Sequence, residues 1–178
     1  RFLLFLHHDM DTAALNKTIR DTAALDATMP DAPRLTLRKA DRLHHRTLVN
    51  GLYDGGNSLY SYPLRMQWRA LSQAELAASF RGDVPKGIAP VQMMVTIPKR
   101  KQRHAVDRVL MRRRVREAYR LSRRQLLDCV CSMPYATVSL SFVYISDKKC
   151  GYAKVQSAVV TLLNKLRKAL AEKQEAMP

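Results

Sequence analysis

Residues 91–126 read VQMMVTIPKRKQRHAVDRVLMRRRVREAYRLSRRQL, and this stretch decides the fold. Every second residue up to Ile97 is apolar, and Pro98 follows, which predicts a strand over 91–97. After a basic turn, apolar residues recur at helical spacing, which predicts one helix over 106–126. A strand that leads into a long helix is typical of domains that layer helices on a sheet.

The flanking sequence extends this pattern in both directions. Upstream, we expect a helix over 38–52. Alternation of apolar and polar residues from Tyr60 to Trp68 predicts one strand, in which Pro63 lies at a sheet edge or a bulge. A short helix over 74–79 is expected in the connection that follows. Downstream, the pattern predicts a strand over 137–145 and a helix over 152–172, whose apolar stripe faces the core. The fold class is therefore α+β, a small α/β sandwich with one sheet covered by helices on one face.

Composition limits the class of protein. The chain has 178 residues, 47% of them hydrophobic, which suits one globular domain. Its net charge of +16 favours a polyanionic partner. Apolar runs are too short to span a membrane, and no secretory signal is visible. Three cysteines without a CxxC pair indicate reduced thiols in a cytoplasmic protein.

The first 33 residues differ from the rest. They are slightly acidic, and they repeat the word DTAAL at 11–15 and 21–25. Two copies are too few for a repeat fold. We expect residues 1–33 to be a flexible or non-native extension of a domain over 34–174. Either the chain is a fragment, or translation starts within it, at Met29.

The strongest functional signal is the charge of residues 99–124, where twelve Lys and Arg accompany only Asp107 and Glu117. Four of the arginines recur at four-residue steps and would stack in one row on a helix: Arg108, Arg112, Arg116 and Arg120. Each like-charged pair at this spacing costs an isolated helix about 0.2–0.5 kcal/mol, and the row has no evident partner within the chain. Phosphates would reverse that cost, because guanidinium groups match phosphate oxygens. Structured RNA, duplex DNA and a membrane surface all carry phosphates.

The same stretch carries a family resemblance. Residues 97–120 resemble the signature of the bacterial ribonuclease P protein component, in its Bacteroidetes-type form, and Arg42-Leu43, residues 61–65 and residues 143–145 agree with it. The resemblance covers about 35–170. It implies a sandwich with a left-handed βαβ crossover that binds a catalytic RNA. Together they would remove the 5′ leader of precursor tRNA in an endonucleolytic reaction.

The charge of this stretch and the resemblance together predict a set of RNA contacts in and before the basic helix: Lys99, Arg100, Arg103, Arg108, Arg112, Arg113, Arg116 and Arg120. One departure stands out, because the family carries Arg-Asn-Arg where this chain has Arg108-Val109-Leu110. Either Val109 and Leu110 pack inward, or the chain has lost one polar contact to the RNA.

Catalysis is expected to belong to the RNA and its Mg²⁺ ions, with no catalytic or metal-binding residue on the protein. A protein nuclease that uses metal ions needs clustered carboxylates. Asp107 and Glu117 lie ten residues apart, about 15 Å along a helix, which is too far to share a metal pair. The adjacent pair His44-His45 diverges on a helix and is not a ligand set. We therefore expect the protein alone to be inactive.

A single-stranded leader requires cations and aromatic surfaces on which bases stack. The candidates are Tyr53, Tyr60, Tyr62, Arg65 and Arg69. Strand alternation also allows Tyr60 and Tyr62 to belong to the core. The hydroxyl row Thr137, Ser139 and Ser141 either lets RNA approach the sheet closely or is simply exposed to solvent.

The predicted partners are the catalytic RNA and precursor tRNA, with no membrane and no DNA. A basic structural RNA-binding protein of ribosomal type, without a processing role, is the alternative. A DNA-binding regulator is less favoured, because the sequence shows no helix-turn-helix spacing and no dimer seam.

Overall fold

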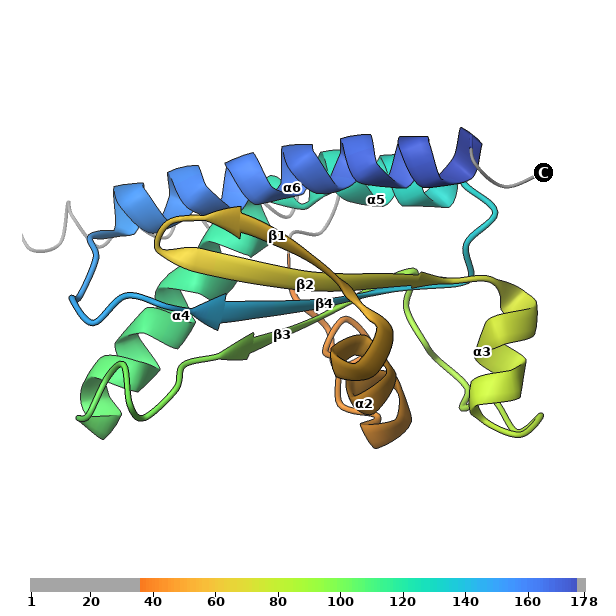
Figure 1. Cartoon of the computed structure of the whole chain (residues 1–178), viewed down its shortest axis with the longest axis horizontal. Helices are drawn as coiled ribbons and strands as arrows, with labels where there is room; N and C mark the ends of the chain where they lie inside the picture. The colour runs from red at the N-terminus through yellow and green to blue at the C-terminus, as the bar shows by residue number, and fades with distance from the viewer. Residues whose placement is uncertain (1–35, 176–178) are drawn as a thin grey trace, which may run out of the picture. The chain divides into compact units, whose positions relative to one another are not determined.

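A computed structural model describes residues 36–175 and places four strands in one sheet between layers of helices (Figure 1). Along the chain the elements are α2 (Arg46–Gly55), β1 (Asn57–Ser61), β2 (Leu64–Leu71), α3 (Gln73–Ser79), β3 (Val91–Thr96), α4 (Ala105–Ser122), α5 (Arg124–Cys131), β4 (Thr137–Tyr144) and α6 (Tyr152–Glu175). The strand order is β1-β2-β4-β3. β2 pairs antiparallel with β1 and β4, whereas β3 runs parallel to β4 and reaches it through α4 and α5, which form a βαβ crossover.

The helices occupy both faces of the sheet. α4, α5 and α6 cover one face and enclose the main core, to which β2 contributes Leu64, Met66 and Trp68. α2 packs on the opposite face, where Leu48 and Leu52 belong to a second, smaller apolar cluster. Figure 1 shows α2 and α6 on opposite sides of the strands. The predicted α+β sandwich is confirmed, with the difference that its second face is also partly covered.

The predicted helix over 38–52 begins later than expected, at Arg46. The preceding residues run alongside β3 instead. The Leu43 N–H donates to the Met93 carbonyl and the Met93 N–H donates to the Asp41 carbonyl, both at 2.9 Å. A parallel bridge therefore pairs Arg42 with Met93. Leu43 continued the helical spacing of Leu48 and Leu52 because it packs in the same apolar cluster, although its backbone is bridged to β3.

The single strand expected from Tyr60 to Trp68 is a hairpin. β1 ends at Ser61, β2 begins at Leu64, and these two residues lie opposite each other across the turn. Tyr60 pairs with Arg65 and therefore faces away from Leu64. Tyr60 is 57% exposed and Tyr62, in the turn, is 55% exposed, so the interpretation that they belong to the core is wrong.

The single helix expected over 106–126 is two helices that meet at Arg123. Although it lies in the most basic stretch of the chain, Arg123 is buried. Its guanidinium forms an ion pair with Asp41 at 2.8 Å. Leu126 and Val130 on α5 are buried in the main core, so the change of direction keeps the apolar side of α5 on that core.

The other predicted elements are found close to their expected bounds: the short helix, the strands before and after the basic helix, and the C-terminal helix. The predicted extension over 1–33 lies outside the described residues. None of the helices that the structure describes combines the length and the hydropathy that crossing a bilayer requires.

Candidate nucleic-acid interface

The helix α4 separates its apolar and cationic residues. Met111, Val115 and Tyr119 are fully buried against the core. On the remaining surface, Arg113 and Arg116 are exposed and Arg112 is half-buried. These three side chains make no ion pair and no hydrogen bond with any residue that the structure describes. Their donors are therefore available to a ligand.

Arg116 lies among other cations. Partial burial, followed by the nearby charges of Arg42 and Arg112, lowers the pKa of Arg116 below its usual value. Arginine nonetheless stays protonated in proteins. Arg42, Arg112 and Arg116 therefore concentrate positive charge on one part of the surface.

The two ends of the predicted arginine row are engaged. Arg120 forms a two-pronged pair with Glu117, at 2.9 Å from Nε and 2.6 Å from Nη2. Arg108 donates from Nη1 to the carbonyls of Gln102 at 3.0 Å and Arg103 at 2.6 Å. The expectation that the row has no partner within the chain is therefore wrong for these two arginines, whereas Arg112 and Arg116 have no partner among residues 36–175.

The loop before α4 presents three more predicted contacts. Lys99, Arg100 and Arg103 are exposed and line an open hollow of about 650 Å³. Gln102 anchors this loop, because its Nε2 donates to the carbonyls of Ser146 at 3.3 Å and Asp147 at 3.0 Å. The cations are thus held on a fixed turn at the start of α4.

Val109 and Leu110 face outward. They are 42% and 38% exposed, and Val106 beside them is 77% exposed. The interpretation that Val109 and Leu110 pack inward is therefore wrong. Apolar side chains occupy solvent-facing positions on the helix that carries the cations.

The predicted leader residues divide into two places. Tyr60 and Arg65 are paired on neighbouring strands of the sheet face that α2 borders. Tyr53 extends from α2 onto the same face, where its hydroxyl lies 3.1 Å from Ser141 Oγ. Arg65 donates to Ser58 Oγ at 2.9 Å, yet its Nε is buried and has no hydrogen-bond partner among residues 36–175. Tyr53, Tyr60 and Arg65 therefore form one polar, partly unsatisfied surface, which we call the open sheet face.

Tyr62 lies elsewhere, and Arg69 is engaged by α2. The Tyr62 hydroxyl is 2.8 Å from Ser146 Oγ, and Lys154 Nζ lies 4.7 Å from the centre of its ring. Arg69 donates to the carbonyl of Gly51 at 2.9 Å and so fastens α2 to the sheet. Tyr62 is therefore not on the open sheet face, whereas Arg69 faces the same side of β2 as Arg65 but is partly covered by α2.

The hydroxyl row on β4 is covered. Thr137, Ser139 and Ser141 are each at most 1% exposed. α2 packs against β4 on this side, and Thr137 Oγ1 donates to the Ala89 carbonyl at 2.9 Å. Both interpretations of the row, close approach by RNA and exposure to solvent, are therefore wrong.

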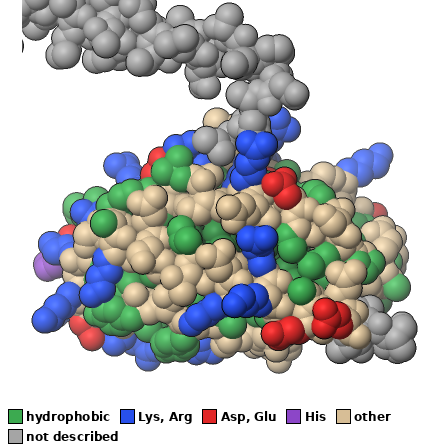
Figure 2. Space-filling view, turned by 90° about the horizontal axis from the view of Figure 1, so that it is seen from above, with side chains coloured by type: hydrophobic (Ala, Val, Ile, Leu, Met, Phe, Trp, Pro, Cys, Tyr) green, Lys and Arg blue, Asp and Glu red, His purple; other side chains and the backbone are tan. Residues whose placement is uncertain are grey.

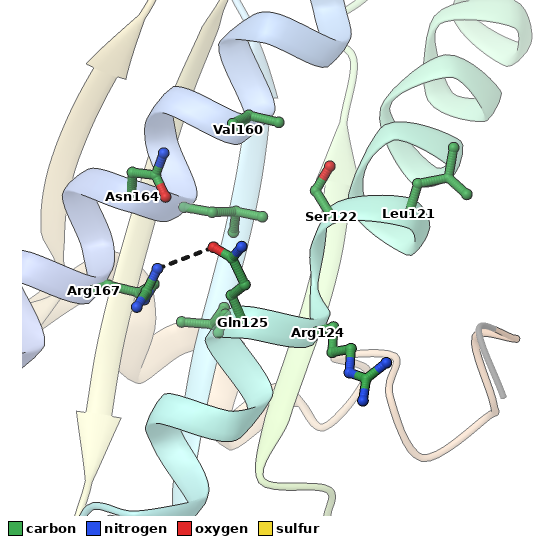
Figure 3. A pocket seen from close by; sticks show the side chains of 9 residues that line it. Leu121, Ser122, Arg124, Gln125, Val160, Asn164 and Arg167 are labelled. Carbon is green, nitrogen blue, oxygen red and sulfur yellow. Dashed lines mark hydrogen bonds between the residues drawn. The ribbon is translucent and has the colours of Figure 1, made fainter. Parts of the chain in front are cut away.

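A separate pocket lies on the helical layer. It measures about 310 Å³ and lies between the end of α4, α5 and α6 (Figure 3). Arg167 on α6 donates to Gln125 on α5 at 3.0 Å beside it. Figure 2 shows that Lys and Arg are scattered singly over the visible face, among apolar and polar side chains. The pocket includes none of the predicted site residues.

Sequence reasoning missed Arg42 as a member of the cationic surface. Arg42 lies far from the basic stretch in the sequence, and only the bridge to β3 brings it near α4. It also missed that Glu117 holds Arg120, although their three-residue spacing on a helix was a readable signal. Among residues 36–175, no three His, Cys, Asp or Glu side chains group in a way that could hold a metal ion.

Comparisons with known proteins agree on one family. A family model described as Ribonuclease P matches residues 37–170. Ribonuclease P protein components from two strains of Porphyromonas gingivalis are each 32% identical to this chain. The first match covers 74% of this chain and 86% of the relative, and the second covers 69% of this chain and 80% of the relative. The solved structure of the Staphylococcus aureus RNase P protein superposes with a TM-score of 0.52 at 15% identity, covering 72% of this chain and 96% of that one, which supports the fold.

Proposed function

The chain belongs to the ribonuclease P protein family and is a protein subunit of that endoribonuclease, and from this premise we propose that it binds the catalytic RNA through α4 and its preceding loop, and the 5′ leader of precursor tRNA through the open sheet face. The proposal places the protein with these RNAs in the cytoplasm. Nothing in the comparisons favours the ribosomal-type alternative.

The observation that carries the proposal is the set of unpaired guanidinium groups on α4. Arg112, Arg113 and Arg116 have no partner among the described residues, and the two acidic side chains of the same helix pair with other cations. Guanidinium forks bind phosphate oxygens in two-pronged fashion and release the counterions condensed on a polynucleotide. A folded RNA would therefore stabilise this surface.

The open sheet face suits a single strand. Tyr53 and Tyr60 are 44% and 57% exposed and offer ring surfaces to bases, and Arg65 lies beside Tyr60. Base stacking on an aromatic ring tolerates any base, which fits a leader whose sequence varies. The buried Gln67 Oε1, which has no partner among the described residues, adds an unsatisfied acceptor on the same face.

The hydrolysis itself would be carried out by the RNA, with Mg²⁺ held mainly by the RNA. Both acids of α4 are already engaged with cations. Asp107 lies 3.2 Å from Lys149 Nζ, and Glu117 is held by Arg120. These residues do not fit a metal pair, so the proposed role of the protein is to bind and position the two RNAs.

A reconstitution tests the proposal. The chain is added to the ribonuclease P RNA of the same organism at low Mg²⁺, and removal of the leader from precursor tRNA is followed. We expect the chain to stimulate cleavage. The double variant Arg112→Ala/Arg113→Ala should bind the RNA more weakly and lower the log–log salt slope by about one per lost phosphate contact. No stimulation, or an unchanged slope, would contradict the proposal.

A matched pair of tyrosine variants tests the leader surface. Tyr60 and Tyr62 are nearly equally exposed, but only Tyr60 lies on the open sheet face. Tyr60→Ala should weaken binding of precursor tRNA by about tenfold, as expected for one lost stack, and leave binding of mature tRNA unchanged. Tyr62→Ala should change neither. Equal effects from the two variants would remove the open sheet face as the leader site.

A further inference from the structure

Arg42 lies at the edge of the sheet with its side chain on the same side as α4. It is paired with Met93 in a parallel bridge beside β3. Residues paired in register direct their side chains to the same face of a sheet. Met93 is buried in the main core on the helical side, whereas the next residue, Leu43, belongs to the apolar cluster of α2. The side chain of Arg42 therefore extends toward the helical layer.

The backbone that carries Arg42 is fixed on both sides. The bridge itself supplies two hydrogen bonds of 2.9 Å, between Leu43 and Met93 and between Met93 and Asp41. Gln92 Nε2 donates to the Ala40 carbonyl at 3.0 Å. The Asp41 carboxylate is held by Arg123 at 2.8 Å. An exposed side chain on so constrained a backbone is well placed for binding, because little backbone freedom remains to be lost.

α4 places Arg116 beside this segment. Arg116 and Arg123 are seven residues apart and share one face of the helical region, with about 10 Å between them along the axis. Because Arg123 contacts Asp41, the segment that carries Arg42 lies against the C-terminal part of α4. The charge of Arg42 also depresses the pKa of Arg116, as does that of Arg112. Arg42 and Arg112 therefore both lie within electrostatic range of Arg116, although Arg42 comes from a distant part of the sequence.

Nothing in the described part of the chain neutralises this group. The nearest acids are already used: Asp41 is paired with Arg123, and Glu117 with Arg120. Arg42, Arg112 and Arg116 have no side-chain hydrogen bond among the described residues. Like charges held together by a rigid fold repel each other unless an anion lies between them. A phosphate, which accepts several two-pronged bonds, is the ligand that this geometry suits.

We infer that Arg42, Arg112 and Arg116 together bind one phosphate of the ribonuclease P RNA backbone, at a site formed jointly by α4 and the bridge segment before α2. The inference rests on the proposed function and adds a ligand that lies outside the basic stretch. Asp41 and Arg123 act as positioning residues, because they fix the segment from which Arg42 extends.

The test measures binding of the full chain to the ribonuclease P RNA over a range of salt concentrations. Arg42→Ala should bind about tenfold more weakly, as for the loss of one charge-assisted hydrogen-bond pair, and its log–log salt slope should fall by less than about one, because Arg112 and Arg116 remain. Arg42→Ala/Arg116→Ala should lower the slope by no more than about one in total, because both arginines act on one phosphate. Arg42→Lys keeps the charge and should preserve the slope while losing part of the affinity. Lys86→Ala, an exposed cation in the α3–β3 connection, is the control and should change neither quantity.

The outcomes distinguish a failure of the proposed function from a failure of the phosphate site alone. If the unaltered chain forms no saturable, salt-sensitive complex, the proposed function fails and the phosphate site with it. If the unaltered chain binds but Arg42→Ala behaves like Lys86→Ala, only the phosphate site is overturned. If the double variant lowers the salt slope by about two, the two arginines bind separate phosphates, and the single site is overturned. Thermal unfolding at the same temperature as the unaltered chain confirms that Arg42→Ala is folded.

Discussion

The guanidinium group of Arg123 donates to the carboxylate of Asp41 at 2.8 Å, and this pair joins the segment before α2 to the junction of α4 and α5. The two side chains are only 9% and 15% exposed. Arg123 also donates to the Thr36 carbonyl at 3.0 Å. One arginine of the basic stretch is therefore part of the scaffold, whereas its exposed neighbours are available to RNA.

Arg123→Ala should destabilise the protein by about 3 kcal/mol, because it leaves the largely buried carboxylate of Asp41 without its partner. Arg124→Ala removes the same charge from an exposed position and should change the free energy of unfolding by less than about 0.5 kcal/mol. Urea denaturation of both variants measures the difference. Equal values would show that the pair contributes nothing to the fold.

This pair also shows where prediction from sequence fails at the site. The twelve Lys and Arg of residues 99–124 cannot be told apart by residue type. The partner that distinguishes Arg123 is Asp41, which lies 82 residues away in the sequence. The engagement of Arg108 with the carbonyls of Gln102 and Arg103 depends on a loop conformation that the sequence does not display. The sequence predicts a cationic surface. Only the structure shows which of its arginines pair within the protein and which remain exposed.

The fold itself was predictable where one face of an element is buried. The strand over 91–97 and the last helix follow from apolar periodicity, because each buries one side in the main core. Alternation of apolar and polar residues did not reveal the hairpin between Tyr60 and Leu64. A two-residue turn leaves the alternation in the sequence unbroken although the chain reverses direction. Helical periodicity failed before Arg46, because Leu43 shares the apolar cluster of Leu48 and Leu52 while its backbone is bridged to β3.

Restoring the family's residues on α4 should strengthen RNA binding. Val109 and Leu110 are exposed, so Val109→Asn/Leu110→Arg adds polar contacts without opening a cavity. We expect binding to ribonuclease P RNA to tighten by about tenfold and the salt slope to rise by about one. The free energy of unfolding should change by less than about 0.5 kcal/mol. A loss of stability of several kcal/mol would instead place these side chains in the core.

The end of α2 should tolerate alanine at Gly55 and reject it at Gly56. A Cβ at Gly55 has its nearest neighbour, Arg69 Nη1, at 3.8 Å, whereas a Cβ at Gly56 would collide with the backbone carbonyl oxygen of Leu52. Gly55→Ala should be neutral or stabilise by up to about 1 kcal/mol. Gly56→Ala should cost about 1–3 kcal/mol, since backbone must shift. Thermal unfolding separates the two variants, and equal melting temperatures would contradict the expected close approach.

Neutralising Glu117 should increase the affinity for RNA. The carboxylate holds Arg120 in a two-pronged pair at 2.6 and 2.9 Å and places a negative charge on the cationic helix. The hydrogen bond from Arg120 lowers the pKa of Glu117, so the pair persists at any pH near neutrality and a substitution is needed to break it. Glu117→Gln should release Arg120 to a phosphate, tighten binding a few-fold and steepen the salt slope by up to about one.

Glu172→Gln on α6 is the control for the Glu117 variant, because it removes the same charge from an exposed position away from α4. The affinity and salt slope of this variant should stay close to those of the unaltered chain, since charges farther apart than about 10 Å are screened at ordinary ionic strength. Arg120→Ala, added to Glu117→Gln, should cancel the gain. If Glu117→Gln and Glu172→Gln have the same effect, Arg120 does not reach the RNA, and the contact surface on α4 ends at Arg116.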